Sequence, residues 1–413
     1  MFKSSSKICI ICKGYRKLCG LKRCPLISST IYRSKAISMI DRGNVDGSTP
    51  PTVLVGESGY PNVRVYLGIP PGVRGDKASF YDNPNQWFGR LGLEDIIDLR
   101  SNLVLTATPK LHIHQIPKTL DLEVLLTSVS TKPVDIEAVV DKVIKASIMF
   151  DSIIPPLGPS VIAKVIRVTS NPQVPKAIEK VIEDDLKASE SVISLYSGGV
   201  DLYVITKAFS LGLLGTLRNR KAVPTRWSVT AVDQIVGNNL LLTVKSRPSI
   251  SEVLVFYSEY MYNKYIVVLA PGSYRGLWIE VWHPSSVFNP GSVTEYLVVE
   301  EYALGKYTYM DGGYIAARTS VAEYLYKIGK QAKVAILREI LPQYIYPVGS
   351  WQIRLNVKNA LEKGPVLRNP SIDEFRSFIE LKMDIPKEVV INLIDFIYGM
   401  KQKKLDNYFR STP

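Results

Sequence analysis

All four cysteines of the 413-residue chain lie within its first 24 residues. They are Cys9, Cys12, Cys19 and Cys24, with the spacing C-x₂-C-x₆-C-x₄-C. Four thiolates this close in sequence can surround one soft cation, and glycines between them let the backbone turn. The neighbouring lysines and arginines would offset the negative charge of such a centre. We therefore predict an N-terminal zinc module, with an iron–sulfur cluster, or disulfides and free thiols, as the alternatives.

Three large apolar side chains stand among lysines in the last twelve residues of the chain. At helical or 3₁₀ spacing Leu405, Tyr408 and Phe409 fall on one side of a short turn, and Gln402 precedes Leu405 by three residues. A soluble protein rarely ends in this way unless a partner receives the side chains. The pattern resembles the PIP box, by which repair and replication proteins bind the DNA sliding clamp (PCNA). That resemblance implies that Gln402 occupies a polar pocket of the clamp and the other three side chains a hydrophobic one.

The alternative for this tail is that it continues the preceding helix and packs on the body. Gly399 and the polar run 401–404 argue against it.

Several cations and one tryptophan form a third group with binding chemistry. Arginine donates paired hydrogen bonds to phosphate, and an indole ring stacks on bases, so the group predicts nucleic-acid or nucleotide binding. Its members are Arg74, Lys77, Arg218, Arg220, Arg226 and Trp227. The alternative is that these arginines pair with Asp201, Asp233 or Glu252 in a structural network.

His112 and His114 alternate as on one face of a strand, and we interpret them as structural because no carboxylate is nearby in sequence.

The net charge of +13 is concentrated at the two ends of the chain. Residues 1–40 hold nine lysines and arginines and no acid, and residues 398–413 carry a net charge of +3, which leaves the body at about +1. A generally basic body that coats nucleic acid is therefore not supported. No run of 18 uncharged apolar residues is present, so we expect a soluble, cytoplasmic and nucleoid-associated protein without a membrane partner.

The apolar pattern divides the body into two parts. For 41–220 it predicts strands at 50–56, 63–68, 122–129 and 161–168, and helices at 93–103, 135–149 and 175–191. For 221–397 it predicts a mostly antiparallel sheet from runs at 253–257, 265–270, 276–283 and 293–301, a strand at 351–357, and helices at 320–344, 373–382 and 386–398. The expected fold class is α+β, with mixed or mostly antiparallel sheets and flanking helices. The metal module and linker (1–40) precede the body, and a flexible tail (398–413) follows it.

Four segments together resemble the archaeal Nre family of DNA repair proteins. They are the four-cysteine N-terminus, the segment Arg74–Phe80, the segment Val223–Ser228 and the C-terminal tail. The resemblance implies a role in the DNA-damage response, with the sliding clamp and DNA as partners, and it assigns no catalytic residue. An enzyme acting on damaged DNA or a nucleotide, with Asp201 or Asp233 in an arginine-lined cleft, is the alternative, as is a non-catalytic clamp adaptor.

Overall fold

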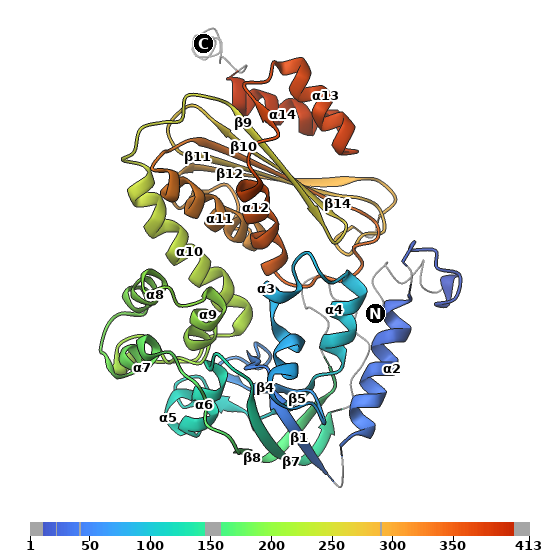
Figure 1. Ribbon diagram of the computed structural model, residues 1–413, viewed down its shortest axis with the longest axis vertical. Helices are drawn as coiled ribbons and strands as arrows, with labels where there is room; N and C mark the ends of the chain where they lie inside the picture. The colour runs from blue at the N-terminus through green and yellow to red at the C-terminus, as the bar shows by residue number, and fades with distance from the viewer. Residues whose placement is uncertain (1–10, 22, 41–42, 145–157, 290, 400–413) are drawn as a thin grey trace, which may run out of the picture. The chain divides into compact units, whose positions relative to one another are not determined.

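The computed structural model describes residues 11–21, 23–40, 43–144, 158–289 and 291–399 (Figure 1). The chain divides into two units. Unit 1 comprises Met1–Asn239 and Tyr346–Leu355, and unit 2 comprises Leu240–Ile345 and Asn356–Pro413. Two of the three boundaries fall within helices α10 (Thr225–Val244) and α12 (Trp351–Lys363), and the third, between Ile345 and Tyr346, lies in the segment before α12. In the part of the chain that the structure describes, no helix is both long and apolar enough to cross a bilayer.

A six-stranded sheet forms the centre of unit 1. In spatial order its strands are β1 (Asn44–Thr49), β7 (Val134–Ile144), β8 (Ser160–Val168), β5 (Val104–Ala107), β4 (Val65–Ile69) and β2 (Val53–Val55). Only the β5–β8 pair is parallel among these neighbours. The outer edge of β1 bonds to the segment that follows β4, through Ser48 N–H to Val73 O (2.8 Å) and Gly72 N–H to Asp46 O (3.0 Å). A Cβ at Gly47 would lie 2.6 Å from Pro70 O, so glycine permits this close approach.

Short helices and a two-stranded ladder complete unit 1. The ladder pairs β3 (Asn62–Val63) with β6 (Leu111–His112). The helical elements are α2 (Pro25–Ser38), η1 (Gly75–Asp82), α3 (Pro84–Trp87), α4 (Leu93–Ser101), α5 (Ile116–Thr119), α6 (Leu122–Ser128), α7 (Lys176–Glu183), α8 (Ala188–Ser197), α9 (Leu202–Ser210) and η2 (Leu217–Asn219). The predicted strand at 161–168 and helix at 93–103 are confirmed.

Two predictions in unit 1 are wrong, because residues 122–128 form a helix and residues 135–144 belong to a strand; residues 145–149 of the predicted helix lie outside the described residues. Asp121 caps α6 by accepting the Glu123 N–H at 2.9 Å. In β7, Val134, Ile136 and Ala138 are buried and alternate with polar residues, which is the period of a strand. The apolar residues of this segment fit both the helical and the strand period, and the pairing of β7 with β1 and β8 selects the strand.

Unit 2 contains a seven-stranded mixed sheet. Its spatial order is β13 (Lys306–Tyr307), β12 (Glu295–Ala303), β11 (Arg275–Trp282), β14 (Lys333–Ile340), β10 (Asn263–Ala270), β9 (Leu254–Tyr260) and β15 (Leu367–Arg368). Among these pairs only β11–β14 is parallel, which confirms the mostly antiparallel prediction. The predicted helix at 320–344 is confirmed as far as Ile328, where α11 (Gly312–Ile328) ends, and is wrong beyond it, because β14 follows. The predicted strand at 351–357 is also wrong, because those residues begin α12.

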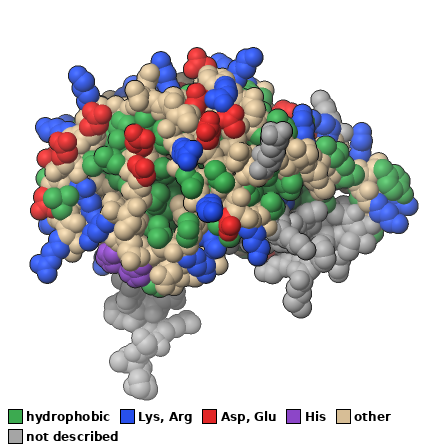
Figure 2. Space-filling model, turned by 90° about the horizontal axis from the view of Figure 1, so that it is seen from below, with side chains coloured by type: hydrophobic (Ala, Val, Ile, Leu, Met, Phe, Trp, Pro, Cys, Tyr) green, Lys and Arg blue, Asp and Glu red, His purple; other side chains and the backbone are tan. Residues whose placement is uncertain are grey.

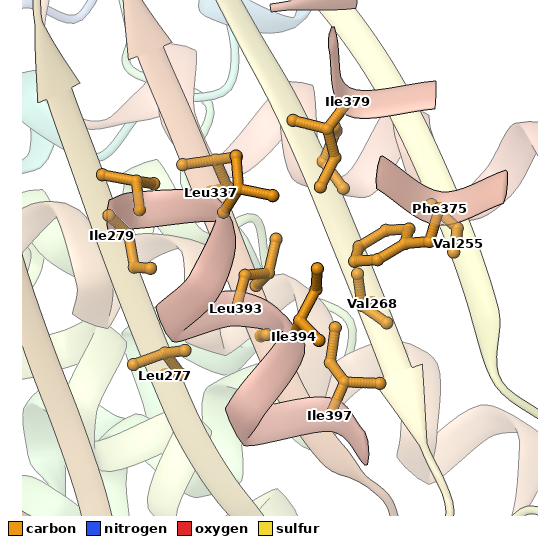
Figure 3. Close-up of a cluster of buried hydrophobic side chains, with 14 of the residues drawn as sticks. Val255, Val268, Leu277, Ile279, Leu337, Phe375, Ile379, Leu393, Ile394 and Ile397 are labelled. Atoms are coloured by element: carbon orange, nitrogen blue, oxygen red, sulfur yellow. The ribbon is translucent and has the colours of Figure 1, made fainter. Parts of the chain in front are cut away.

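Helices cover both faces of this sheet. On one face α13 (Ile372–Lys382) and α14 (Lys387–Tyr398) bury Phe375, Ile379 and Leu393 against strand residues such as Val268 and Leu337 (Figure 3). Each such side chain contributes about 1.5–3 kcal/mol when it is fully buried. On the opposite face α11 places Tyr314 against Trp278 and Tyr324 against Phe256. The sequence predictions for α13 and α14 are confirmed, including the helix stop at Gly399, whose φ is 72°.

Candidate functional site

The structure describes three of the four N-terminal cysteines. Cys12, Cys19 and Cys24 are free thiols, and Cys9 lies outside the described residues. Backbone N–H groups, first that of Leu18 and then that of Gly14, lower the pKa of the buried Cys12 below its ordinary value. A Cβ at Gly14 would lie 3.3 Å from Cys24 Sγ, so the backbone after Cys12 runs against Cys24.

This donor set fits a soft cation, because the thiolate is the form that binds one. Among the residues that the structure describes, however, no three cysteine, histidine or carboxylate side chains gather in an arrangement that could hold a metal ion. Zinc therefore stays a prediction. The predicted clamp-binding residues Gln402, Leu405, Tyr408 and Phe409 also lie outside the described residues, which end at Gly399.

Arg226 and Trp227 lie in the first turn of α10 and reach the surface. Arg226 Nη1 bonds to Glu57 Oε1 at 3.1 Å, with both side chains substantially exposed. Trp227 is 45% exposed and its ring lies 5.2 Å from that of Tyr60, which is 44% exposed. Thr225 Oγ1 accepts the Val55 N–H at 2.8 Å, which ties the start of α10 to the end of β2. These contacts fix an exposed aromatic pair beside an arginine.

The other predicted cations lie on different elements. Arg74 bonds to Asp46 at 2.5 Å and lies 3.8 Å from Asp135, over β1 and β7. Lys77 is exposed on η1, and Arg218 is exposed on η2. The structure thus does not link Arg74 with Arg226 through the contacts that either side chain makes.

Arg220 is buried, and its guanidinium donates hydrogen bonds to backbone carbonyls. Nε donates to Gly215 O at 2.9 Å, Nη1 to Ile182 O at 2.7 Å and Nη2 to Asp184 O at 2.9 Å. Two of these acceptors lie at the end of α7, where helical carbonyls lack partners within the helix. We therefore leave Arg220 out of the proposed binding surface.

The acids named as alternative partners bind elsewhere. Asp233 is buried in an ion pair with Arg354, whose guanidinium also lies over the Tyr203 ring at 5.4 Å. Asp201 accepts from Asn85 Nδ2 at 3.2 Å and caps α9. In unit 2, Glu252 pairs with Arg368 at 3.1 Å.

A polar cluster in unit 1 was missed by sequence reasoning. Asp82 accepts from Thr52 Oγ1 (2.8 Å) and Arg100 Nη2 (3.1 Å), and Lys207 Nζ donates to Pro51 O (2.9 Å). Burial lowers the pKa of Lys207, while Asp82 acts in the opposite direction. The available signal was that Lys207 is the only charged residue in the apolar run 204–214.

Unit 2 holds two further groups of buried ions on β14. Arg338 pairs with Glu280 and donates to Asn263 Oδ1 at 2.9 Å. On the next residue Glu339 accepts from His283 Nε2 (2.8 Å) and Lys264 Nζ (3.0 Å). A charged pair inside the apolar run 334–341 was the sequence signal for both groups.

Comparison with known proteins covers nearly the whole chain. Residues 18–289 match the family model described as "Archaeal Nre, N-terminal", and residues 301–408 match "Archaeal Nre, C-terminal". DNA repair protein NreA of Archaeoglobus fulgidus is 35% identical over 362 residues, which is 86% of this chain and 89% of that protein. DNA repair protein NreB of the same organism is 35% identical over 350 residues, 84% of this chain and 86% of that protein. DNA repair protein NreA of Haloferax volcanii is 33% identical over 332 residues, 76% of this chain and 78% of that protein. No solved structure matches the chain.

Proposed function

Because the chain belongs to the archaeal Nre family, we propose that it is a DNA repair protein that binds the sliding clamp through its C-terminal tail. The observation that carries the repair role is the similarity to three proteins named DNA repair protein, over 76–86% of this chain. The two family matches together extend from residue 18 to residue 408 and lie in both units, so the similarity is not confined to one module.

The tail supports the clamp as partner. The C-terminal family match runs to residue 408 and so includes Gln402, Leu405 and Tyr408. Three apolar anchors at about 1.5–3 kcal/mol each would contribute roughly 5–9 kcal/mol when buried in a pocket. Ordering the tail and losing translational freedom remove several kcal/mol, so we expect a Kd in the micromolar range. Such an affinity suits a tail that binds the clamp and is released from it readily.

The cysteines support a structural zinc ion in the N-terminal module. Cys9, Cys12, Cys19 and Cys24 would hold it, and the ion would cross-link residues 9–24 where no large apolar core is available. The lowered pKa of Cys12 favours its thiolate form, and Cys24 Sγ lies close to the backbone at Gly14, two residues after Cys12. An iron–sulfur cluster is the alternative cofactor.

Direct binding to DNA is the second part of the proposal. Its candidate surface contains Arg226 and Trp227, whose side chains are exposed at the start of α10. Arg74, Lys77 and Arg218 are exposed on other elements and could extend the contact.

Asp233 does not serve the alternative in which the protein is an enzyme, because its carboxylate is buried against Arg354 and does not line a cleft. The adaptor alternative needs the clamp tail and no cleft.

The clamp interaction is tested by surface plasmon resonance of the full chain on an immobilised archaeal sliding clamp. We expect micromolar binding by the native protein and a loss of about 10-fold or more for Phe409→Ala, because one buried anchor is worth about 1.5–3 kcal/mol. Tyr302→Ala is the matched control, since Tyr302 is an exposed aromatic residue on β12 in unit 2. Equal binding by the native protein, Phe409→Ala and a chain lacking 401–413 would exclude the tail as the clamp ligand.

A further inference from the structure

Two aromatic rings are in contact at the surface of unit 1. Tyr60 and Trp227 are 44% and 45% exposed, and their ring planes meet at 51° with centroids 5.2 Å apart. By contrast, Trp87, Trp278 and Trp351 are at most 4% exposed. Leaving two large rings in water forgoes the stabilisation that burial would bring. A ligand that covers them would recover it.

The rings are held in place by contacts around them. Thr225 Oγ1 bonds to Val55 N–H (2.8 Å) and to Ser210 Oγ (2.9 Å), which fixes the first turn of α10 on the β2–β3 turn. The ion pair between Arg226 and Glu57 joins the same two segments. A surface that is already ordered loses little conformational entropy on binding a ligand.

A third segment of the chain, residues 110–114, runs beside the aromatic pair. Asn62 pairs with His112 in the β3–β6 ladder, and Ile113 N–H bonds to Pro61 O at 3.0 Å. Ala222 N–H bonds to Ile113 O at 2.9 Å, so the irregular segment 220–224, which leads to Trp227, lies on the other side of this segment. The His112 and His114 rings stack with centroids 5.5 Å apart. Figure 2 shows histidine side chains gathered at the surface with lysine and arginine side chains nearby.

Cations predominate on the exposed side of these three segments. Lys110, Lys221 and Arg226 are exposed, and the acid on the same segments is Glu57. The Lys110 ammonium lies 2.9 Å from the position that a Cβ at Gly59 would occupy, directly before Tyr60 in the chain. Lys110 and Arg226 therefore place positive charge beside the rings, although the body as a whole is nearly neutral.

We propose that Tyr60 and Trp227 stack on unpaired bases of single-stranded DNA, while Lys110, Lys221 and Arg226 contact its phosphates. The inference rests on the proposed repair function, because damage and its processing leave unpaired bases. Every base has a π face, so such a platform binds with little dependence on sequence. Arg226 can leave Glu57 for a phosphate at small cost, since exposed ion pairs contribute about 0–1 kcal/mol.

The test measures fluorescence anisotropy of a dye-labelled oligothymidylate of about 12 nucleotides with the full chain. Trp227→Ala and Tyr60→Ala should each weaken binding about 5- to 150-fold, which corresponds to one lost stacking contact. Trp227→Phe and Tyr60→Phe keep an aromatic face and should stay within about threefold of the native Kd. Arg226→Ala should reduce the slope of log K against log salt by about 0.7. Tyr302→Ala, outside the platform, should change nothing.

Separate outcomes judge this inference and the proposed function. Trp227→Ala should lose single-stranded DNA and keep the clamp, whereas Phe409→Ala should do the opposite. Native affinity in both alanine variants, with unchanged thermal unfolding, would overturn the platform. So would equal losses in the alanine and phenylalanine variants, or equal losses for single-stranded and duplex DNA. If Trp227→Ala instead abolished clamp binding and left DNA binding intact, the platform would be a protein-docking surface and the inference would be wrong.

Discussion

Removing the arginine from the buried Glu301–Arg318 pair should strongly destabilise unit 2. Glu301 is fully buried and Arg318 is 2% exposed. Arg318 Nε and Nη2 bond to the two carboxylate oxygens at 2.7 and 2.8 Å. The Tyr274 and Tyr314 hydroxyls donate to the same carboxylate at 2.8 and 2.7 Å.

The expected loss follows from the charge that Arg318→Met would leave behind. Deleting one partner of a buried ion pair costs about 3–5 kcal/mol, and the tyrosine donors that remain favour the low end of this range. At about 2–4 °C per kcal/mol for a unit of this size, the Tm should fall by roughly 6–20 °C. Methionine keeps most of the side-chain volume, so the effect is mainly electrostatic.

The destabilisation caused by Arg318→Met should depend on pH. Burial alone would raise the pKa of Glu301, but the hydrogen bonds and charge of Arg318 hold it below its ordinary value. In the native protein this group therefore contributes stability above the ordinary carboxyl range and loses it as the pH falls through the folded pKa. In Arg318→Met burial is no longer opposed by the arginine, so Glu301 should take up a proton more readily. The variant's deficit should be smaller at pH 5 than at pH 8.

The assay is thermal unfolding by circular dichroism and scanning calorimetry at pH 5 and pH 8. Glu301→Gln and the double variant complete a double-mutant cycle, in which the double variant should be less destabilised than the sum of the two single ones. A loss below about 1 kcal/mol for Arg318→Met, or additive effects in the cycle, would refute the buried-pair reasoning.

Two further predictions concern a half-buried acid and the metal. Burial, and then the charge of Glu280, raise the pKa of Asp311 from its ordinary value of 3.8 to about 6. Asp311 therefore contributes stability below pH 3.8, and this contribution is lost as the pH rises through about 6. Asp311→Asn keeps an acceptor for the Tyr314 N–H. The variant should therefore have a higher Tm than the native protein at pH 8, equivalent to about 1–3 kcal/mol, and no higher Tm at pH 4. A lower Tm at pH 8 would contradict this prediction. Elemental analysis should find one zinc and no iron per native chain, and Cys12→Ser should reduce the zinc content; one iron–sulfur cluster per chain would contradict zinc.

Local patterns predicted the elements that carry clear start and stop signals. Pro386 precedes α14 and Gly399 ends it, and the β-branched run 265–270 is part of β10. The prediction for 320–344 failed for a different reason. β14 lies between β11 and β10 and is buried on both faces, so its continuous apolar run has no period that separates strand from helix.

The candidate binding surface was predictable only in part. The composition of 217–233 pointed to Arg226 and Trp227, which are exposed, but it gave equal weight to Arg220, which is buried. Tyr60 and Lys110 could not be joined to them from sequence, because the β3–β6 ladder and the Val55–Thr225 bond depend on long-range contacts.

The claim that this chain is a clamp-dependent repair protein is tested most directly by survival after DNA damage. An archaeal host that lacks its own Nre gene would be complemented with the native chain, Phe409→Ala or Tyr302→Ala, all expressed at equal levels. We predict that the native chain and Tyr302→Ala restore survival after exposure to a DNA-damaging agent, and that Phe409→Ala does not. Failure of the native chain to restore survival, or full restoration by Phe409→Ala, would contradict the proposed function.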